Sequence, residues 1–313
     1  MPSLFTLLRC AWKPAHMKAR HLSLAVLITA IWGVNFSVIK LGLATVDPFI
    51  LAGLRFLLCA VPAVLLIPKP AVPWCYLISY GLVFGVGLWG VVNLGIKTGL
   101  SAGLAALVLQ FSAFFTIALG TLVFSEPLRR HQIAGGLLAV FGLALIILIT
   151  DGSVSLTGVM LVICGAACWS IANLIVKRAN TREVFGFLVW SSAFSPIPLF
   201  LLSYLLNGAA GYVSFVEQLN LTALLSLAFQ VYPNTLLAYW IWNALLRQYP
   251  LSTVAPLSLL VPVFGLLGSV LIFNETLPML KLIALALVLV GLLVGLYGQS
   301  VFDRFIALQQ RSL

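Results

Sequence analysis

Residues 89–97 read WGVVNLGIK, and residues 239–247 read YWIWNALLR. Both stretches place an aromatic residue, an amide and a cation at intervals of four positions, and the two stretches lie 150 positions apart. The members of the pattern are Trp89, Asn93 and Lys97 in the first stretch and Tyr239, Asn243 and Arg247 in the second. Residues four apart lie on one face of an α-helix. The pattern therefore predicts the same type of helix in two parts of the chain, which indicates an internal repeat.

Two more pairs of stretches occur in the same order along the chain. The residues of one pair are Trp32, Asn35 and Lys40, matched by Trp169, Asn173 and Lys177; the tryptophans and the lysines are 137 positions apart, and each asparagine lies between them. In the other pair, FSEPL at residues 124–128 is matched by FNETL at residues 273–277, 149 positions later. The repeat is therefore five helices long, and because five is odd the second copy must cross the membrane in the opposite sense. Inverted repeats of this kind occur in secondary transporters, with the substrate site near the bilayer midplane.

The composition is that of a membrane protein. Hydrophobic residues make up 62% of the 313 residues, charged residues 8%, and the mean hydropathy is +1.16, whereas a soluble domain carries about 25% charged residues. The apolar residues form blocks that are each long enough to cross a hydrocarbon core about 30 Å thick. The predicted spans are residues 22–44, 49–67, 74–96, 101–124, 131–149, 156–176, 186–206, 221–245, 251–273 and 279–298. We expect an all-α membrane protein with ten transmembrane helices as two inverted five-helix repeats.

The predicted boundaries follow from these spans. They give a basic N-terminal segment at 1–21, a first repeat at 22–149, a second repeat at 156–298 and a cytoplasmic tail at 299–313. A start of translation at Met17 is an alternative that would leave only a short basic head. Pro196 and Pro198 interrupt the seventh span, which a membrane tolerates only where neighbours or water satisfy the freed backbone groups.

The basic residues that give the net charge of +10 are unevenly divided between the two sides of the membrane, and this division predicts the orientation of the chain. Thirteen Lys and Arg residues fall on the side of the N-terminus, and three, Lys40, Lys97 and Lys281, fall on the opposite side. Basic residues gather in cytoplasmic loops, so we expect both termini in the cytoplasm. Since the basic residues are spread over short loops without a nucleic-acid motif, we expect no nucleic-acid partner. The expected partners are the lipid bilayer and a small-molecule substrate.

Several of these stretches resemble the EamA-type transporters of the drug/metabolite transporter superfamily. The resemblance rests on WGVNF at 32–36, LAGLRF at 51–56, and the segment from SAGL at 101–104 through Glu126. VAPLSLLVP at 254–262, with VLQ at 108–110 and FFT at 114–116, looks like the O-acetylserine/cysteine exporter branch. The resemblance covers roughly residues 22–298. It implies a bacterial inner-membrane protein with a central cavity lined mainly by the first, third, fourth, sixth, eighth and ninth spans. The fifth and tenth spans would lie outside this cavity, where contact with a second copy, a homodimer, is left open.

Polar side chains inside spans are costly in the bilayer, so they mark candidate site residues. We expect the substrate-binding residues to be Trp32, Asn35, Arg55, Trp89, Asn93, Gln110, Trp169, Asn173, Tyr239 and Asn243. Amides can donate to and accept from a zwitterion, and aromatic faces attract an ammonium group. Arg55 could bind a substrate carboxylate, or pair with helix carbonyls or Asp47. The alternatives are interhelical hydrogen bonds for the amides and packing or the interfacial belt for the aromatics.

The leading functional hypothesis is an exporter of small metabolites by alternating access. Neutral amino acids or derivatives such as cysteine or O-acetylserine are the expected substrates, and aromatic amino acids, drugs or nucleotide sugars are the alternatives. A channel is a remote alternative. An enzyme is not expected, because no HExxH or GxSxG motif occurs. Five cysteines without a CxxC pair provide too few ligands for a metal, so we expect no cofactor. None of the seven Asp and Glu residues lies in mid-span, so proton coupling has no sequence support.

Overall fold

The computed structural model describes residues 17–124, 128–148, 152, 154–249 and 254–309. Side chains at 124, 243, 246–247, 255–256 and 299–309 are outside that description. Most of the N-terminal segment, including its first sixteen residues, and Glu126 therefore lie outside the described residues. Within the described part, nine helices are long and apolar enough to cross a membrane, and Leu257–Phe273 is a shorter apolar helix in the position of the ninth predicted span.

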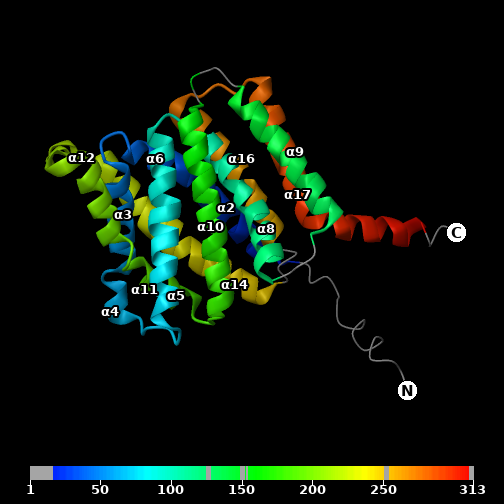
Figure 1. The fold of residues 1–313 in the computed structure, drawn as a ribbon, viewed down its shortest axis with the longest axis horizontal. Helices are drawn as coiled ribbons and strands as arrows, with labels where there is room; N and C mark the ends of the chain where they lie inside the picture. Colours follow the sequence, from blue (N-terminus) through cyan, green and yellow to red (C-terminus); the bar gives the residue numbers. More distant parts are fainter. Residues whose placement is uncertain (1–16, 125–127, 149–151, 153, 250–253, 310–313) are drawn as a thin grey trace.

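The helices follow the ten predicted spans in order (Figure 1). The first repeat consists of α2 (Ala19–Gly42), α3 (Pro48–Ala60) with α4 (Ala63–Leu66), α5 (Trp74–Gly81) with η1 (Leu82–Gly90) and α6 (Val91–Lys97), α7 (Ala102–Val108) with η2 (Leu109–Phe111) and α8 (Ser112–Phe124), and α9 (Arg130–Ile147). The second repeat consists of α10 (Leu156–Ala179), α11 (Val184–Ser192) with α12 (Pro196–Gln218), α13 (Leu221–Phe229) with η3 (Gln230–Leu237) and α14 (Ala238–Gln248), η4 (Ala255–Leu259) with α16 (Leu260–Phe273), and α17 (Met279–Gln309).

Irregular turns recur at matching places in the two repeats. The third span contains the π-helical segment η1, and the eighth span contains the π-helical segment η3. The fourth and ninth spans contain the 3₁₀ segments η2 and η4. Because π and 3₁₀ turns are uncommon inside long helices, their occurrence at equivalent positions supports the duplication that the residue pattern predicts.

The contacts between repeats are also paired. Spans 1 and 6 are equivalent in the two repeats. Span 1 packs on span 9 (α2 on α16), and span 6 packs correspondingly on span 4 (α10 on α8). Span 1 also contacts span 8, and span 6 correspondingly contacts span 3. Three contacts join equivalent spans directly, namely α3 with α12, α7 with α16 and α9 with α17. These paired contacts are those expected of two repeats related by an approximate twofold axis. The predicted fold class of inverted five-helix repeats is confirmed.

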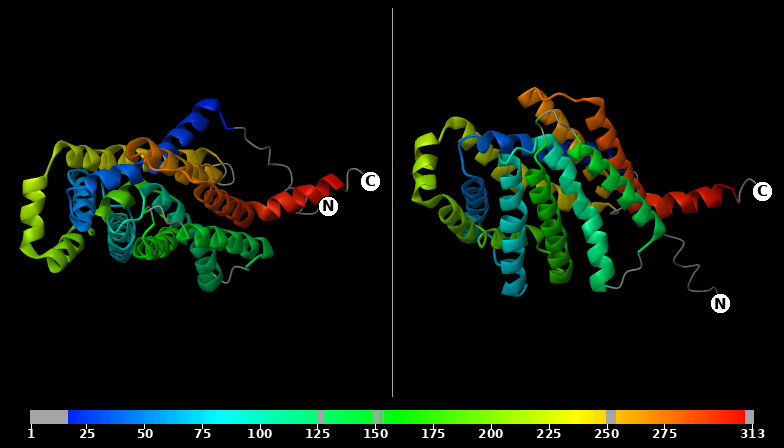
Figure 2. Two further views of the ribbon diagram at one scale, coloured as in Figure 1. Left: turned by 90° about the horizontal axis from the view of Figure 1, so that it is seen from above. Right: turned by 45° about the horizontal axis from the view of Figure 1, so that its top comes forward.

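The seventh span differs in detail from the prediction. It is broken between Ser192 and Pro196, as the proline pair predicts, and Ser195 Oγ donates a 2.8 Å hydrogen bond to the backbone oxygen of Gly81. Its second helix continues well past the predicted end at residue 206, with a bend at Gly208, where φ is +61°. That backbone conformation is open to glycine because it has no Cβ. Figures 1 and 2 show α12 at the edge of the molecule opposite α9 and α17.

The fifth and tenth spans, α9 and α17, pack against each other through glycines. A Cβ built on Gly135 would overlap the backbone of Gly291 and Gly295, so the two helices approach more closely than side chains allow. Such close approach is a common device for joining membrane helices, where the lipid removes most of the hydrophobic driving force.

We expect Gly135→Ala to lower the free energy of unfolding by about 1–3 kcal/mol, because the added methyl group has no space between the helices. The matched control is Gly136→Ala, since a Cβ at Gly136 lies at ordinary contact distance, 3.6 Å, from Phe114 Cδ1. Thermal unfolding in detergent, followed by tryptophan fluorescence, measures both variants. Equal midpoints for the two variants would contradict the packing argument.

Candidate substrate-binding site

Arg55 lies in α3 with its side chain fully buried. Its Nε and Nη2 donate to Thr235 Oγ1 at 3.1 and 3.0 Å, and its guanidinium carbon lies 4.2 Å from the ring centre of Trp89. The Nη1 atom has no hydrogen-bond partner among the described residues, and no described carboxylate lies within ion-pair distance of Arg55. Arg55 is thus a buried cation held by a neutral hydroxyl and an aromatic face.

The predicted alternative of a pair between Arg55 and Asp47 is wrong. Asp47 Oδ1 accepts from the backbone nitrogens of Phe49 and Ile50 at 2.9 and 3.0 Å, and Asp47 Oδ2 accepts from Asn207 at 2.9 Å. The carboxylate therefore caps the first turn of α3, a role that an N-cap aspartate fills well. Both oxygens of Asp47 thus accept hydrogen bonds at the start of α3, and Arg55 has no negatively charged partner among the described residues.

Thr235 owes its position to the π-helical segment η3. Its Oγ1 donates to the backbone oxygen of Gln230, five residues back, at 2.7 Å. Pro233 within the same segment has no N–H and would clash with a regular α-helical turn. The wider turn accommodates the proline and directs a hydroxyl of span 8 at a cation of span 2. The hydrogen bonds from Arg55 to Thr235 therefore join the first repeat to the second.

Aromatic rings surround this contact on the side of spans 1, 3 and 8. Trp32 Nε1 donates to the backbone oxygen of Asn234 at 3.2 Å, and its ring centre lies 5.2 Å from that of Tyr239. Phe84 lies 6.5 Å from Trp89 and 6.3 Å from Tyr239, centre to centre. The predicted residues Trp32, Arg55, Trp89 and Tyr239 therefore belong to one connected cluster, which we call the Arg55 cluster together with Phe84 and Thr235.

Several buried polar atoms next to this cluster have no hydrogen-bond partner in the described part of the chain. They are both amide atoms of Asn35, Trp89 Nε1, Asn93 Oδ1, Gln230 Oε1 and Asn234 Oδ1. Asn93 does use its Nδ2, which donates to the backbone oxygen of Pro48 at 3.3 Å. An unsatisfied buried polar group costs about 1–3 kcal/mol. The concentration of such unsatisfied polar atoms on spans 1, 3 and 8 is what we expect of a region that binds a polar ligand.

Six predicted residues are not joined to the Arg55 cluster by any contact described in the structure, namely the buried amides Asn35 and Asn93 and four others. Gln110 is buried in η2, and Trp169 is half-buried in α10. Asn173 is exposed, whereas its repeat partner Asn35 is fully buried. The side chain of Asn243 lies outside the described residues. The cluster is thus formed by spans 1, 2, 3 and 8, which is less symmetric than the repeat alone predicts.

The sequence interpretation did not include Thr235, Gln230 or Phe84. A signal for the first two was present, because QVYPNT at residues 230–235 is a polar, proline-containing run inside an apolar span. Such interruptions in transporters occur where backbone lines a cavity. Phe84 has no comparable signal, since one more phenylalanine in an apolar span is indistinguishable from packing.

A cavity of about 880 Å³ lies against other residues of span 8, and no residue of the Arg55 cluster lines it. Tyr232, Leu236 and Trp240 of span 8 line it, together with Ile67 after α4 and Arg182 before α11. Its volume is in the range of small-molecule sites. Leu236 directly follows Thr235 in the chain, so one residue of this turn lines the cavity and its neighbour contacts Arg55.

A bundle of apolar spans in two paired repeats, with a buried cation and buried amides inside it, is an architecture typical of membrane transporters. The sequence matches the EamA-like transporter family over residues 20–148 and again over residues 156–297. The chain therefore belongs to the EamA-like transporter family, which confirms the EamA resemblance and makes the protein a transporter and not an enzyme. The resemblance to the O-acetylserine/cysteine exporter branch stays a prediction.

Individual relatives agree with this membership. The chain is 41% identical over 281 residues to a "Probable amino-acid metabolite efflux pump" of Salmonella typhimurium, covering 88% of this chain and 94% of the relative. It is 39% identical over 283 residues to a protein of the same description from Escherichia coli K12, with the same coverage. A solved crystal structure aligns with 90% of this chain and 98% of its own at a TM-score of 0.58 and 19% identity, which shows a shared fold.

Proposed function

We propose that the chain exports amino acids or small amino-acid derivatives, such as cysteine or O-acetylserine, by alternating access between its two repeats. The substrate carboxylate binds Arg55, and its remaining polar groups meet the unsatisfied amides, Asn35 first among them. The description of the two bacterial relatives as amino-acid metabolite efflux pumps supports this class of substrate.

The observation that carries the proposal is the missing counter-charge of Arg55. A charge taken out of water is normally paired or coordinated, yet Arg55 is fully buried with Nη1 unpartnered and no carboxylate beside it in the described residues. A substrate carboxylate supplies this partner through charge-assisted hydrogen bonds, which are roughly twice as strong as neutral ones.

The aromatic rings favour a second candidate substrate within the same fold. Trp32, Phe84, Trp89 and Tyr239 offer a large apolar surface next to Arg55. Aromatic amino acids or amphipathic drugs would use that surface more fully than cysteine does. A panel of substrates compared in one export assay separates the two candidates.

We further propose that the protein lies in the bacterial inner membrane with both termini in the cytoplasm. The bacterial relatives and the excess of Lys and Arg on the N-terminal side support this orientation. Lys40 and Glu275 then lie at the outer face, and Arg182, at the mouth of the large cavity, lies at the cytoplasmic face.

The test of this function is metabolite export from cells that overproduce the chain. We expect more cysteine or O-acetylserine in the medium than from cells with an empty vector. Asn35→Ala is expected to reduce this export about tenfold, the effect of losing one good hydrogen bond to substrate. Ser37→Ala is the matched control, because its hydroxyl is also buried and unpartnered but lies against Gly268 of span 9. Absence of both metabolites from the medium would contradict the substrate assignment.

A further inference from the structure

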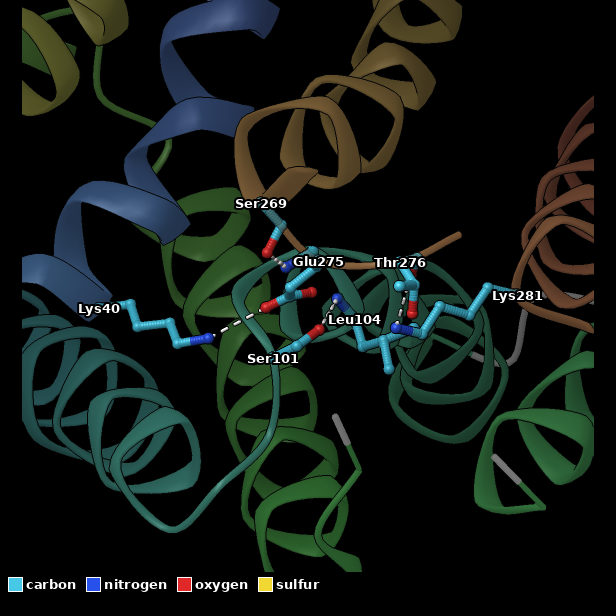
Figure 3. A network of polar contacts seen from close by, with 8 residues as sticks. Lys40, Ser101, Leu104, Ser269, Glu275, Thr276 and Lys281 are labelled. Atoms are coloured by element: carbon cyan, nitrogen blue, oxygen red, sulfur yellow. Dashed lines mark hydrogen bonds and ion pairs between the residues drawn. The ribbon is translucent and has the colours of Figure 1, made fainter. Parts of the chain in front are cut away.

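An ion pair joins the two repeats at one end of the molecule. Lys40 lies in the last turn of α2, and Glu275 lies just after the end of α16. Lys40 Nζ is 3.0 Å from Glu275 Oε1 and 4.3 Å from the ring centre of Phe273 (Figure 3). The pair therefore links span 1 of the first repeat to span 9 of the second.

Both charged groups also line a small cavity of about 290 Å³. Its other walls include Ile96, Gly99, Leu100 and Ser101 from the turn between α6 and α7. This volume lies at the lower limit of ligand pockets, so it admits a small metabolite and not a drug-sized molecule. The side chains of Lys40 and Glu275 are 33% and 13% exposed, so solutes can reach both.

Three other described charged residues near this end make contacts of their own. Lys97 Nζ donates to the backbone oxygen of Leu43, Lys281 Nζ donates to that of Thr276, and Asp47 caps α3. Beneath the pair, Ser269 Oγ accepts from the backbone nitrogen of Gly103, which fixes span 4 to span 9 (Figure 3). The cavity thus presents one cation and one anion side by side, close to a hydrogen bond that joins spans 4 and 9.

We propose that this cavity is a second binding site, selective for zwitterionic amino acids, and that binding there opens the ion pair. This inference rests on the proposed function. The substrate carboxylate forms an ion pair with Lys40, and the substrate ammonium forms an ion pair with Glu275. One ion pair is thereby exchanged for two, and the ion-pair contact between spans 1 and 9 is lost, while their helix packing remains.

The energetics favour such an exchange. A partly exposed ion pair contributes little net free energy, so little is lost when it opens. A ligand that carries only a carboxylate would occupy Lys40 and leave Glu275 unpaired. A ligand that carries only an ammonium would do the reverse. The site therefore distinguishes a free amino acid from its N-acetylated or esterified form.

Equilibrium binding of labelled O-acetylserine to the purified full chain tests the proposal without relying on transport. In an Arg55→Met background, which removes the central site, we expect residual binding of O-acetylserine that N-acetylserine does not compete away. Adding Glu275→Gln is expected to weaken this residual binding about tenfold, the effect of losing one charged contact. Binding that survives Glu275→Gln unchanged, or Arg55→Met protein that binds nothing, overturns the second site.

Charge reversal separates the pair's role from general stability. Glu275→Lys alone places two cations together, and we expect it to lose the residual binding. Lys40→Glu combined with Glu275→Lys restores an ion pair with the zwitterion turned around, so we expect binding to return. Failure of the double variant to bind better than the single one contradicts the exchange. If wild-type protein binds at both sites but exports nothing, the proposed function fails while this inference stands.

Discussion

Replacing Arg55 with methionine is expected to weaken export of carboxylate-bearing substrates about ten- to a hundredfold while leaving the protein as stable as the wild type, or more stable. The guanidinium is fully buried without a counter-charge among the described residues, so folding bears its desolvation cost. Methionine has a similar length and a polarisable sulfur that packs well against aromatic rings such as Trp89. Charged groups with no stabilising partner are a mark of sites kept for function.

The size of the loss in export follows from the lost contact. A hydrogen bond to a charged group is worth about 1.5–3 kcal/mol, which corresponds to about ten- to a hundredfold in affinity. Arg55→Lys is the informative companion, because lysine keeps the charge but cannot donate in the fixed fork of a guanidinium. We expect it to retain part of the export. Thermal unfolding and the export assay are run on the same preparations. A destabilised Arg55→Met protein, or one with full export, would contradict this interpretation of Arg55.

The fold could be predicted from the sequence because its determinants are local and repeated. Apolar length defines each span, and the three matched stretches define the five-helix repeat. The pair at residues 89–97 and 239–247 falls in spans that both contain a π-helical segment. The extent of the seventh span was harder to predict, because the bend at Gly208 depends on a backbone conformation that a glycine permits but does not require.

The candidate site could be predicted only in part, because the repeats have diverged. Arg55 was recognisable as the cation most embedded in a span, and Asn35 as an amide deep in the first span. Symmetry gave Asn173 the same role as Asn35, but one is exposed and the other fully buried. Thr235 was missed because a threonine in a membrane helix usually bonds its own backbone. Its contact with Arg55, 180 positions away, is a product of packing.

Two of the contacts between the repeats bear on the alternating access that we propose. The contact between Arg55 and Thr235 joins spans 2 and 8 in the interior, and the pair of Lys40 and Glu275 joins spans 1 and 9 at one end. On this proposal, rocking of one repeat against the other opens the pair at the end and turns about the interior contact. Substrate bound at Arg55 would then lie near the pivot.

Thr235→Val is expected to lower stability by about 1–3 kcal/mol, because it leaves Nε and Nη2 of buried Arg55 without their acceptor. It is also expected to raise the KM for export without an equal fall in kcat, since the guanidinium loses the group that orients it. Thr235→Ser keeps the hydroxyl and should restore both quantities.

The double variant Arg55→Met with Thr235→Val gives the sharpest measure of this link. Once Arg55 is gone, the hydroxyl of Thr235 has no cation to hold, and its loss leaves only the hydrogen bond to the backbone of Gln230 unmade. The stability cost of Thr235→Val should therefore be much smaller in the Arg55→Met background than in the wild type. Groups in direct contact show such non-additivity, whereas distant groups add. Equal costs in the two backgrounds would mean that Thr235 stabilises span 8 alone and does not position Arg55.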